Sequence, residues 1–157
     1  MRKNGLIVNV SSQSGQLKYF HPRLRARFLS PDLTLTELDA LVGEYSTNTL
    51  RLLRAGPPLA YSTSKAALNA ATRILARENP RLLINCCCPG WVGTLLGAQA
   101  GQPPKSVGKC GVILIRDLSL TISTEDGARI PLRLAIGDIG QVSGRYWAND
   151  SVASTGD

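Results

Sequence analysis

The sequence predicts an α/β protein built on a parallel sheet. Leu6–Val10 is a short apolar run with β-branched residues, which is typical of a buried strand. Residues 61–78 keep one apolar face at helical spacing and stop at Asn79-Pro80, which indicates a helix. Residues 82–88 form a second apolar run, which ends at Pro89-Gly90. This strand–helix–strand order predicts a right-handed crossover between two parallel strands.

Weaker signals place the remaining elements. Thr34 and Glu37 have the spacing of a capping box, so we expect a short helix over about 35–45. Apolar patterns predict another short helix over 129–136 and a last short strand over 142–147. Stretches rich in Gly, Pro and polar residues are expected to be loops: 11–31, 46–60 and 97–111. The polar residues 149–157 are expected to form a frayed tail.

Composition excludes several classes of protein. Hydrophobic residues make up 43% and charged residues 18% of the 157 residues, which is the balance of a packed domain and not of a disordered chain. No apolar run approaches the roughly 18 residues of a membrane span, and the short apolar stretch near the start does not have the form of a signal peptide. We therefore expect a cytoplasmic protein that does not bind membranes.

The net charge of +7 is unevenly distributed. Residues 1–81 hold 12 Lys or Arg against 5 Asp or Glu, whereas residues 82–157 hold 6 of each kind. Such a basic half could bind nucleic acid, anionic lipid or a phosphorylated small molecule. No nucleic-acid-binding motif accompanies the charge, so we interpret it as a basic surface and expect no nucleic acid partner.

Four cysteines occur, at Cys86, Cys87, Cys88 and Cys110. Three in a row cannot pair with one another, and a zinc site would need a suitably spaced second pair or a nearby histidine. The single histidine, His21, is far away in the sequence. We expect buried, reduced thiols and no metal site.

Tyr61 and Lys65 are four residues apart at the start of a predicted helix, so both lie on one helix face. A free tyrosine has a pKa of about 10 and is a poor acid–base catalyst at neutral pH. A nearby ammonium group favours the phenolate, and such a tuned tyrosine can exchange a proton with a carbonyl or alcohol oxygen. The pair alone is weak support for catalysis, because many such pairs occur on protein surfaces.

Two further segments strengthen the interpretation. Asn9-Val10-Ser11-Ser12 ends the first predicted strand, and Pro89-Gly90-Trp91-Val92-x-Thr94 follows the second. With Tyr61-Ser62-Thr63-Ser64-Lys65 between them, the chain resembles the short-chain dehydrogenase/reductase family in motif order and placement. The resemblance covers about residues 4–96 and, more loosely, 124–148. It implies the second half of a Rossmann fold, a doubly wound parallel sheet.

The resemblance also implies roles for individual residues. The tyrosine of the family is the general acid/base, the lysine stabilises its phenolate and binds the nicotinamide ribose, and a serine orients the substrate carbonyl. Carried over, these implied catalytic residues are Ser12, Tyr61 and Lys65, with Ser11 and Ser14 as less favoured serines. The implied cofactor-binding residues are Tyr61, Lys65, Pro89, Gly90, Val92 and Thr94.

One segment narrows the resemblance to carbonyl-reductase-like members. Ser12 and Tyr61 are 49 residues apart, far more than in most of the family. The intervening Leu17-Lys18 and the pattern from Pro22 to Phe28 look like the insertion of that subgroup, as does the run from Cys87 to Val92. The resemblance implies NADPH-dependent reduction of a small-molecule carbonyl to an alcohol, by a monomer. NADP in place of NAD rests on subgroup analogy alone.

The sequence also departs from the family. No Gly-rich dinucleotide-binding loop is present, and we expect the N-terminal half of the fold to be absent. We divide the chain into a partial domain over 1–148 and a polar tail over 149–157. Within the domain, 107–124 has no family counterpart and suggests a retained intron or a gene-model error, with a genuine insertion as the alternative. A catalytically inactive truncated fragment or a non-enzymatic binding module is therefore the rival to an active reductase.

Overall fold

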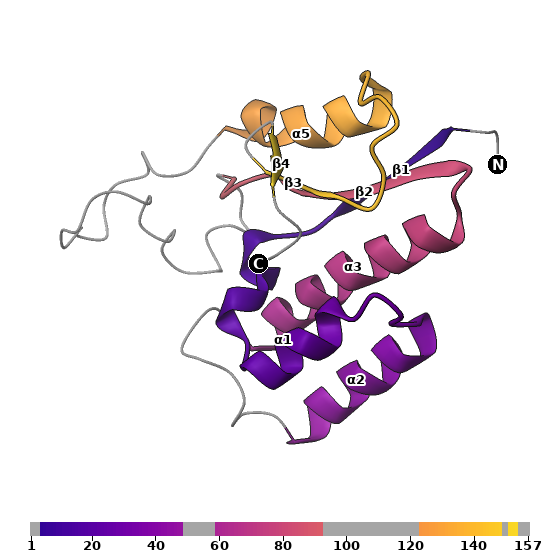
Figure 1. The fold of residues 1–157 in the computed structure, drawn as a ribbon. Coiled ribbons are helices and arrows are strands. Elements are labelled where there is room, and N and C mark those ends of the chain that lie inside the picture. The colour runs from indigo at the N-terminus through magenta and orange to yellow at the C-terminus, as the bar shows by residue number, and fades with distance from the viewer. Residues whose placement is uncertain (1–3, 49–58, 93–122, 149–150, 154–157) are drawn as a thin grey trace, which may run out of the picture.

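One four-stranded sheet organises the molecule (Figure 1). The structure, a computed structural model, describes residues 4–48, 59–92, 123–148 and 151–153. The strands follow one another across the sheet in chain order: β1 (Gly5–Val10), β2 (Leu82–Cys88), β3 (Tyr146–Ala148) and β4 (Ser151–Ala153). β1, β2 and β3 are parallel, and β4 pairs antiparallel with β3. The predicted parallel pairing of the first two strands is confirmed.

Helices cover both faces of this sheet, as Figure 1 shows. α3 (Leu59–Glu78) lies on one face and α5 (Thr124–Ile136) on the other. The α5 face is apolar because side chains from the three parallel strands, from α5 and from the segment between α5 and β3 meet there: Leu6, Val8, Leu83, Cys87, Ile130, Leu134, Ile139, Val142 and Trp147. The α/β class and a Rossmann-like arrangement with helices on both faces are thus confirmed.

The two crossovers differ in hand. β1, β2 and β3 advance in one direction across the sheet, while the helices that connect them lie on opposite faces. Two crossovers that advance in the same direction but pass over opposite faces of a sheet have opposite hands. One of the two is therefore left-handed, a form that occurs in only about 2% of parallel crossovers. Helices therefore cover both faces of the described sheet without the usual reversal of strand order.

The segment between β1 and α3 is largely helical, which corrects the loop expected over 11–31. It contains two short 3₁₀ helices, η1 (Gln13–Gly15) and η2 (Leu17–Tyr19), and then α1 (Pro22–Leu29) and α2 (Leu35–Asn48). α1 begins with proline at its first turn, and the Nδ1 atom of His21 accepts a hydrogen bond from the Arg23 N–H. The sequence did not predict α1, because this helix is short and rich in arginine.

α1 and α2 pack on the side of α3 that faces away from the sheet. Phe20 and Phe28 meet edge to face, with ring centroids 5.9 Å apart. Around them lies a cluster of buried side chains from the three helices, from η2 and from the residues between α1 and α2: Leu17, Leu24, Leu33, Leu38, Leu41, Ala66, Ala70 and Ile74. This second core holds α3 from the side opposite the sheet.

The predicted capping box is confirmed at the start of α2. The Thr34 hydroxyl accepts from the Glu37 N–H at 3.2 Å, and the Glu37 carboxylate accepts from the Thr34 N–H at 2.9 Å. The bond from the Thr34 N–H first, and then a bond from the Thr34 hydroxyl to the same carboxylate at 2.8 Å, lower the pKa of Glu37. The helix extends to Asn48, three residues beyond the expected end.

The C-terminal expectations need two corrections. The tail expected to fray from residue 149 contains β4, so Ser151–Ala153 belongs to the sheet. Ser123 and Thr124, the last residues of the atypical segment 107–124, belong to α5: Ser123 caps the helix and accepts from the Asp126 N–H at 3.0 Å. The rest of that segment and the loop expected over 97–111 lie outside the described residues.

Across the described ranges, no helix is both long and apolar enough to cross a bilayer.

Candidate active site

The sequence motifs meet at the carboxyl edge of the parallel strands. In the β1–β2 register Val10 lies beside Cys87, and the Ser11 N–H continues the ladder by donating to the Cys87 carbonyl at 2.7 Å. The residues that follow the two strands, Ser11-Ser12 and Pro89-Gly90, are therefore neighbours at one edge of the sheet. In open α/β sheets, ligands bind outside this edge.

α3 brings Lys65 and Tyr61 to the same edge. The Lys65 Nζ donates to the Val10 carbonyl at 3.0 Å, which ties the first turns of the helix to the end of β1. The same Nζ lies 5.5 Å from the centroid of the Tyr61 ring. Tyr61 is 44% exposed, so its phenol is accessible to a ligand. An ammonium group has three donors, and two remain after the bond to Val10.

Two of the three candidate serines, Ser11 and Ser12, occupy different environments. Ser11 is buried, and its hydroxyl donates to Asn69 Oδ1 at 2.5 Å and lies 3.4 Å from the Lys65 carbonyl. Ser12 is half-buried, and its hydroxyl oxygen accepts from the Ser14 N–H at 3.1 Å. Ser11 thus holds α3 against β1, while the Ser12 hydroxyl donates to none of the residues that the structure describes.

The turn after β2 has a conformation suited to close approach. Gly90 has a φ of 90°, in the region that favours glycine, and its N–H points back to Cys88 Sγ at 3.4 Å. Val92 packs against α5, where a Cβ added at Gly127 would lie 2.5 Å from its Cγ2. Thr94, the last implied cofactor contact, lies outside the described residues.

Two residues important to this arrangement were not singled out from the sequence. Gly15 of η1 lies directly against the helix backbone, since an added Cβ would sit 2.6 Å from the Lys65 carbonyl carbon. Asn69 accepts the Ser11 hydrogen bond from the next turn of α3. The four-residue spacing of Tyr61, Lys65 and Asn69 on one helix face was a usable signal for Asn69. No pattern in the neighbouring sequence indicated a special role for Gly15.

We expect Gly15→Ala to destabilise the protein by about 1–3 kcal/mol, because its methyl group collides with rigid backbone of α3. Equilibrium unfolding in urea measures the change. Gly43→Ala is the matched control: Gly43 is an exposed residue of α2 whose added Cβ meets nothing within 4 Å. It should stabilise by about 0.5–1 kcal/mol, since alanine is the better helix former. If the two variants changed the free energy of unfolding equally, Gly15 would not lie against the backbone of α3.

The cysteines of β2 are free and buried, as expected for Cys86, Cys87 and Cys88, while Cys110 lies outside the described residues. Burial raises the pKa of Cys86 to about 11. Burial, and then the neighbouring Cys86 and Cys88, raise the pKa of Cys87 to about 12. These two thiols are therefore protonated at neutral pH and are poor nucleophiles. No cluster of metal-ligating side chains occurs among the residues that the structure describes.

Because the pKa values of Cys86 and Cys87 are raised in the folded state, we expect the free energy of unfolding to fall in alkaline solution. The unfolded chain releases its thiol protons from about pH 9, whereas folded Cys86 retains its proton to about pH 11. The unfolded state then binds fewer protons, and the free energy of unfolding falls with pH by at most about 1.4 kcal/mol per pH unit per thiol. Urea unfolding between about pH 8 and pH 11 tests this. The double variant Cys86→Ala/Cys87→Ala should show a shallower fall; an unchanged slope would refute the assignment.

The chain is similar in sequence and in structure to known proteins. No protein-family profile matches the chain. The chain is 35% identical over 154 residues to short-chain dehydrogenase/reductase 1 of Saponaria officinalis, covering 93% of this chain and 44% of that protein. It is 31% identical over 147 residues to carbonyl reductase (NADPH) 1 of Oryctolagus cuniculus, covering 87% of this chain and 46% of that protein. The structure of salutaridine reductase from Papaver somniferum superposes with a TM-score of 0.64 at 30% identity, covering 92% of this chain and 45% of that one.

The fold and the relatives point to the same family. The strand order, the helices on both faces and the superposition make it part of a Rossmann-like α/β fold. The chain belongs to the short-chain dehydrogenase/reductase family, and its relatives there include carbonyl reductases, as the motifs predicted. It spans less than half the length of the three proteins compared.

Proposed function

We propose that the chain supplies the catalytic part of an NADPH-dependent reductase that converts a small-molecule carbonyl to an alcohol. The observation that carries the proposal is the Tyr61–Lys65 pair, held at the carboxyl edge of the sheet by the bond from Lys65 to Val10. Relatives named as reductases, one of them with NADPH in its name, support the choice of reaction and cofactor. Since the chain covers less than half of each of them, we propose the activity for a protein in which this part is joined to the rest of the fold.

The described residues fit the nicotinamide end of such a cofactor. Lys65 keeps two donors for a ribose hydroxyl, and the left-handed Gly90 leaves the turn after β2 without a side chain. Pro89, Gly90 and Val92 would then line the nicotinamide ring, with Thr94 at its carboxamide. When bound, the cofactor supplies a hydride to the carbonyl carbon.

The chain's own residues handle the oxygen and the proton. The Tyr61 phenol donates its proton to the carbonyl oxygen as negative charge develops there, and the Lys65 ammonium stabilises the phenolate that remains. The Ser12 hydroxyl donates to the same oxygen and orients it toward Tyr61. Ser11, being buried and bonded to Asn69, holds α3 in place and does not touch the substrate.

Two further properties complete the proposal. α1 and α2 cover the outer side of α3, which supports the monomeric state implied by the subgroup; sedimentation velocity would test it. The free buried thiols support a reducing compartment such as the cytoplasm.

A chimaera tests the reaction. The chain replaces the corresponding part of rabbit carbonyl reductase, and NADPH oxidation is followed with a quinone or an aromatic aldehyde. We expect turnover by the chimaera and none by the chain alone, because a hydride donor held beside the substrate lowers the barrier by about 7–11 kcal/mol in favourable cases. A folded chimaera that binds NADPH without turnover would favour the rival, a binding module or an inactive fragment.

A further inference from the structure

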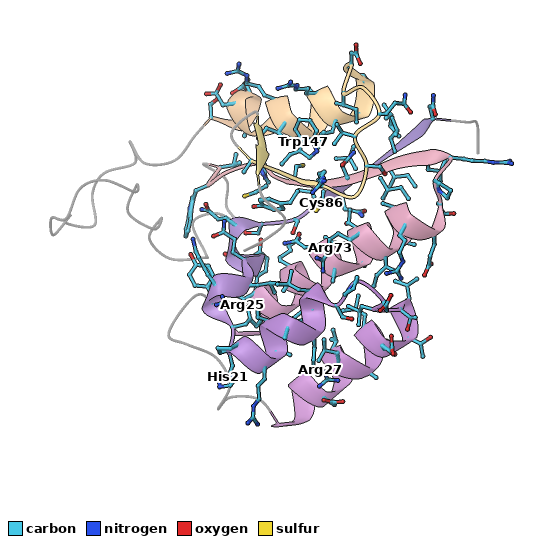
Figure 2. The ribbon with its side chains drawn as sticks, viewed as in Figure 1. His21, Arg25, Arg27, Arg73, Cys86 and Trp147 are labelled. Atoms are coloured by element: carbon cyan, nitrogen blue, oxygen red, sulfur yellow. The ribbon has the colours of Figure 1, made fainter. Side chains whose placement is uncertain are left out.

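A small cavity lies between α3, α1 and the sheet, behind the candidate active site. Its volume is about 20 Å³. Asn69 and Arg73 of α3, Cys86 of β2 and Tyr146 of β3 contribute to its lining, and Phe28 of α1 closes one side. Figure 2 shows Arg73 and Cys86 in this region between the helix and the sheet.

Two polar groups lining the cavity lack partners. Tyr146 is only 3% exposed, and its hydroxyl has no hydrogen-bond partner among the described residues. The Oδ1 atom of Asn69 accepts from Ser11 and from the Cys86 thiol, but its buried Nδ2 has no partner within the same residues. Burial first, and then the neighbouring Cys88, raise the pKa of Tyr146, so the phenol keeps its proton.

An unpaired buried donor destabilises the folded state, because it has lost its hydrogen bonds to water and gained none in return. Two such groups beside one cavity need an occupant that accepts hydrogen bonds from them. A water molecule requires roughly 10–15 Å³ of cavity and two or more polar partners. The volume of about 20 Å³ is sufficient for one water molecule.

We propose that this cavity binds a single structural water molecule, which accepts from Asn69 Nδ2 and bonds to the Tyr146 hydroxyl. The water completes a polar chain that runs from Ser11 on β1, through Asn69 on α3, to Tyr146 on β3. It joins the helix that carries Tyr61 and Lys65 to the third strand of the sheet. The site does not depend on the proposed reaction.

The sign of a stability change tests the water. Tyr146→Phe should lower the midpoint of urea unfolding, because the substitution removes a bonded hydroxyl and leaves the water short of a partner. A dry cavity predicts the opposite or no change, since the substitution would then remove an unpaired buried group. Tyr61→Phe is the matched control: it removes the hydroxyl of a tyrosine that is 44% exposed and should leave the midpoint unchanged.

A crystal structure of the chain gives the direct test. We expect one ordered water within hydrogen-bond distance of both Asn69 Nδ2 and the Tyr146 hydroxyl, with changed occupancy or position in Tyr146→Phe. The proposal would be overturned by an empty cavity or by a direct hydrogen bond from Tyr146 to another side chain. It would also be overturned if a side chain of the protein occupied the position of the water.

Discussion

Tyr61→Phe is expected to lower kcat of the active chimaera by about 10²–10⁴-fold, the usual contribution of general acid–base catalysis. The substitution removes the phenolic proton at this edge of the sheet and keeps the ring beside Lys65. Because the ring remains, KM should change little. Steady-state kinetics with saturating NADPH separates the two parameters.

Tyr19→Phe provides a matched control for this loss. Tyr19 also has a lysine near its ring, with Lys18 Nζ 5.1 Å from the centroid, and is half-buried against the α1–α3 core. Removal of its hydroxyl should leave kcat within a few-fold of the unsubstituted chimaera. If both variants lost activity equally, or if Tyr61→Phe retained it, Tyr61 would not be the proton donor.

Phe28→Ala should have the largest effect on stability, a loss of about 3–5 kcal/mol. Phe28 is 1% exposed, packs edge to face on Phe20 and faces α3 from α1. Truncation to alanine leaves a cavity that rigid helices on both sides cannot close. Urea unfolding followed by circular dichroism measures the loss.

Leu132→Ala is the control for Phe28→Ala. Leu132 lies on α5 and is 54% exposed, so its truncation should change the free energy of unfolding by less than about 0.5 kcal/mol. A small effect of Phe28→Ala would mean that α1 lies loosely on α3 and does not help to hold the helix that carries Tyr61 and Lys65.

The central strand–helix–strand unit was predictable because its signals are local. Leu6–Val10 and residues 82–88 are apolar without interruption, and 61–78 repeats apolar residues at helical spacing. Pairing in parallel then follows from chain connectivity. The capping box at Thr34 was equally readable, since its two hydrogen bonds join residues three apart.

Elements stabilised mainly by distant contacts were missed. α1 has three arginines among its eight residues, and its apolar Leu24 and Phe28 are too few to mark a helix. They become a core only against α3, some 40 residues later in the chain. β4 likewise depends on pairing with β3 and not on its own composition.

For the candidate site, the sequence alone determined the Tyr61–Lys65 pair and its place at the start of a helix, because four-residue spacing defines a helix face wherever the helix lies. Only the tertiary structure decided which serine is buried, through the bond between Ser11 and Asn69. It also decided that Gly15 must lack a side chain, because the backbone of Lys65 occupies the space. Both properties depend on which distant segment lies against a residue, and that is decided when the helix packs on the sheet.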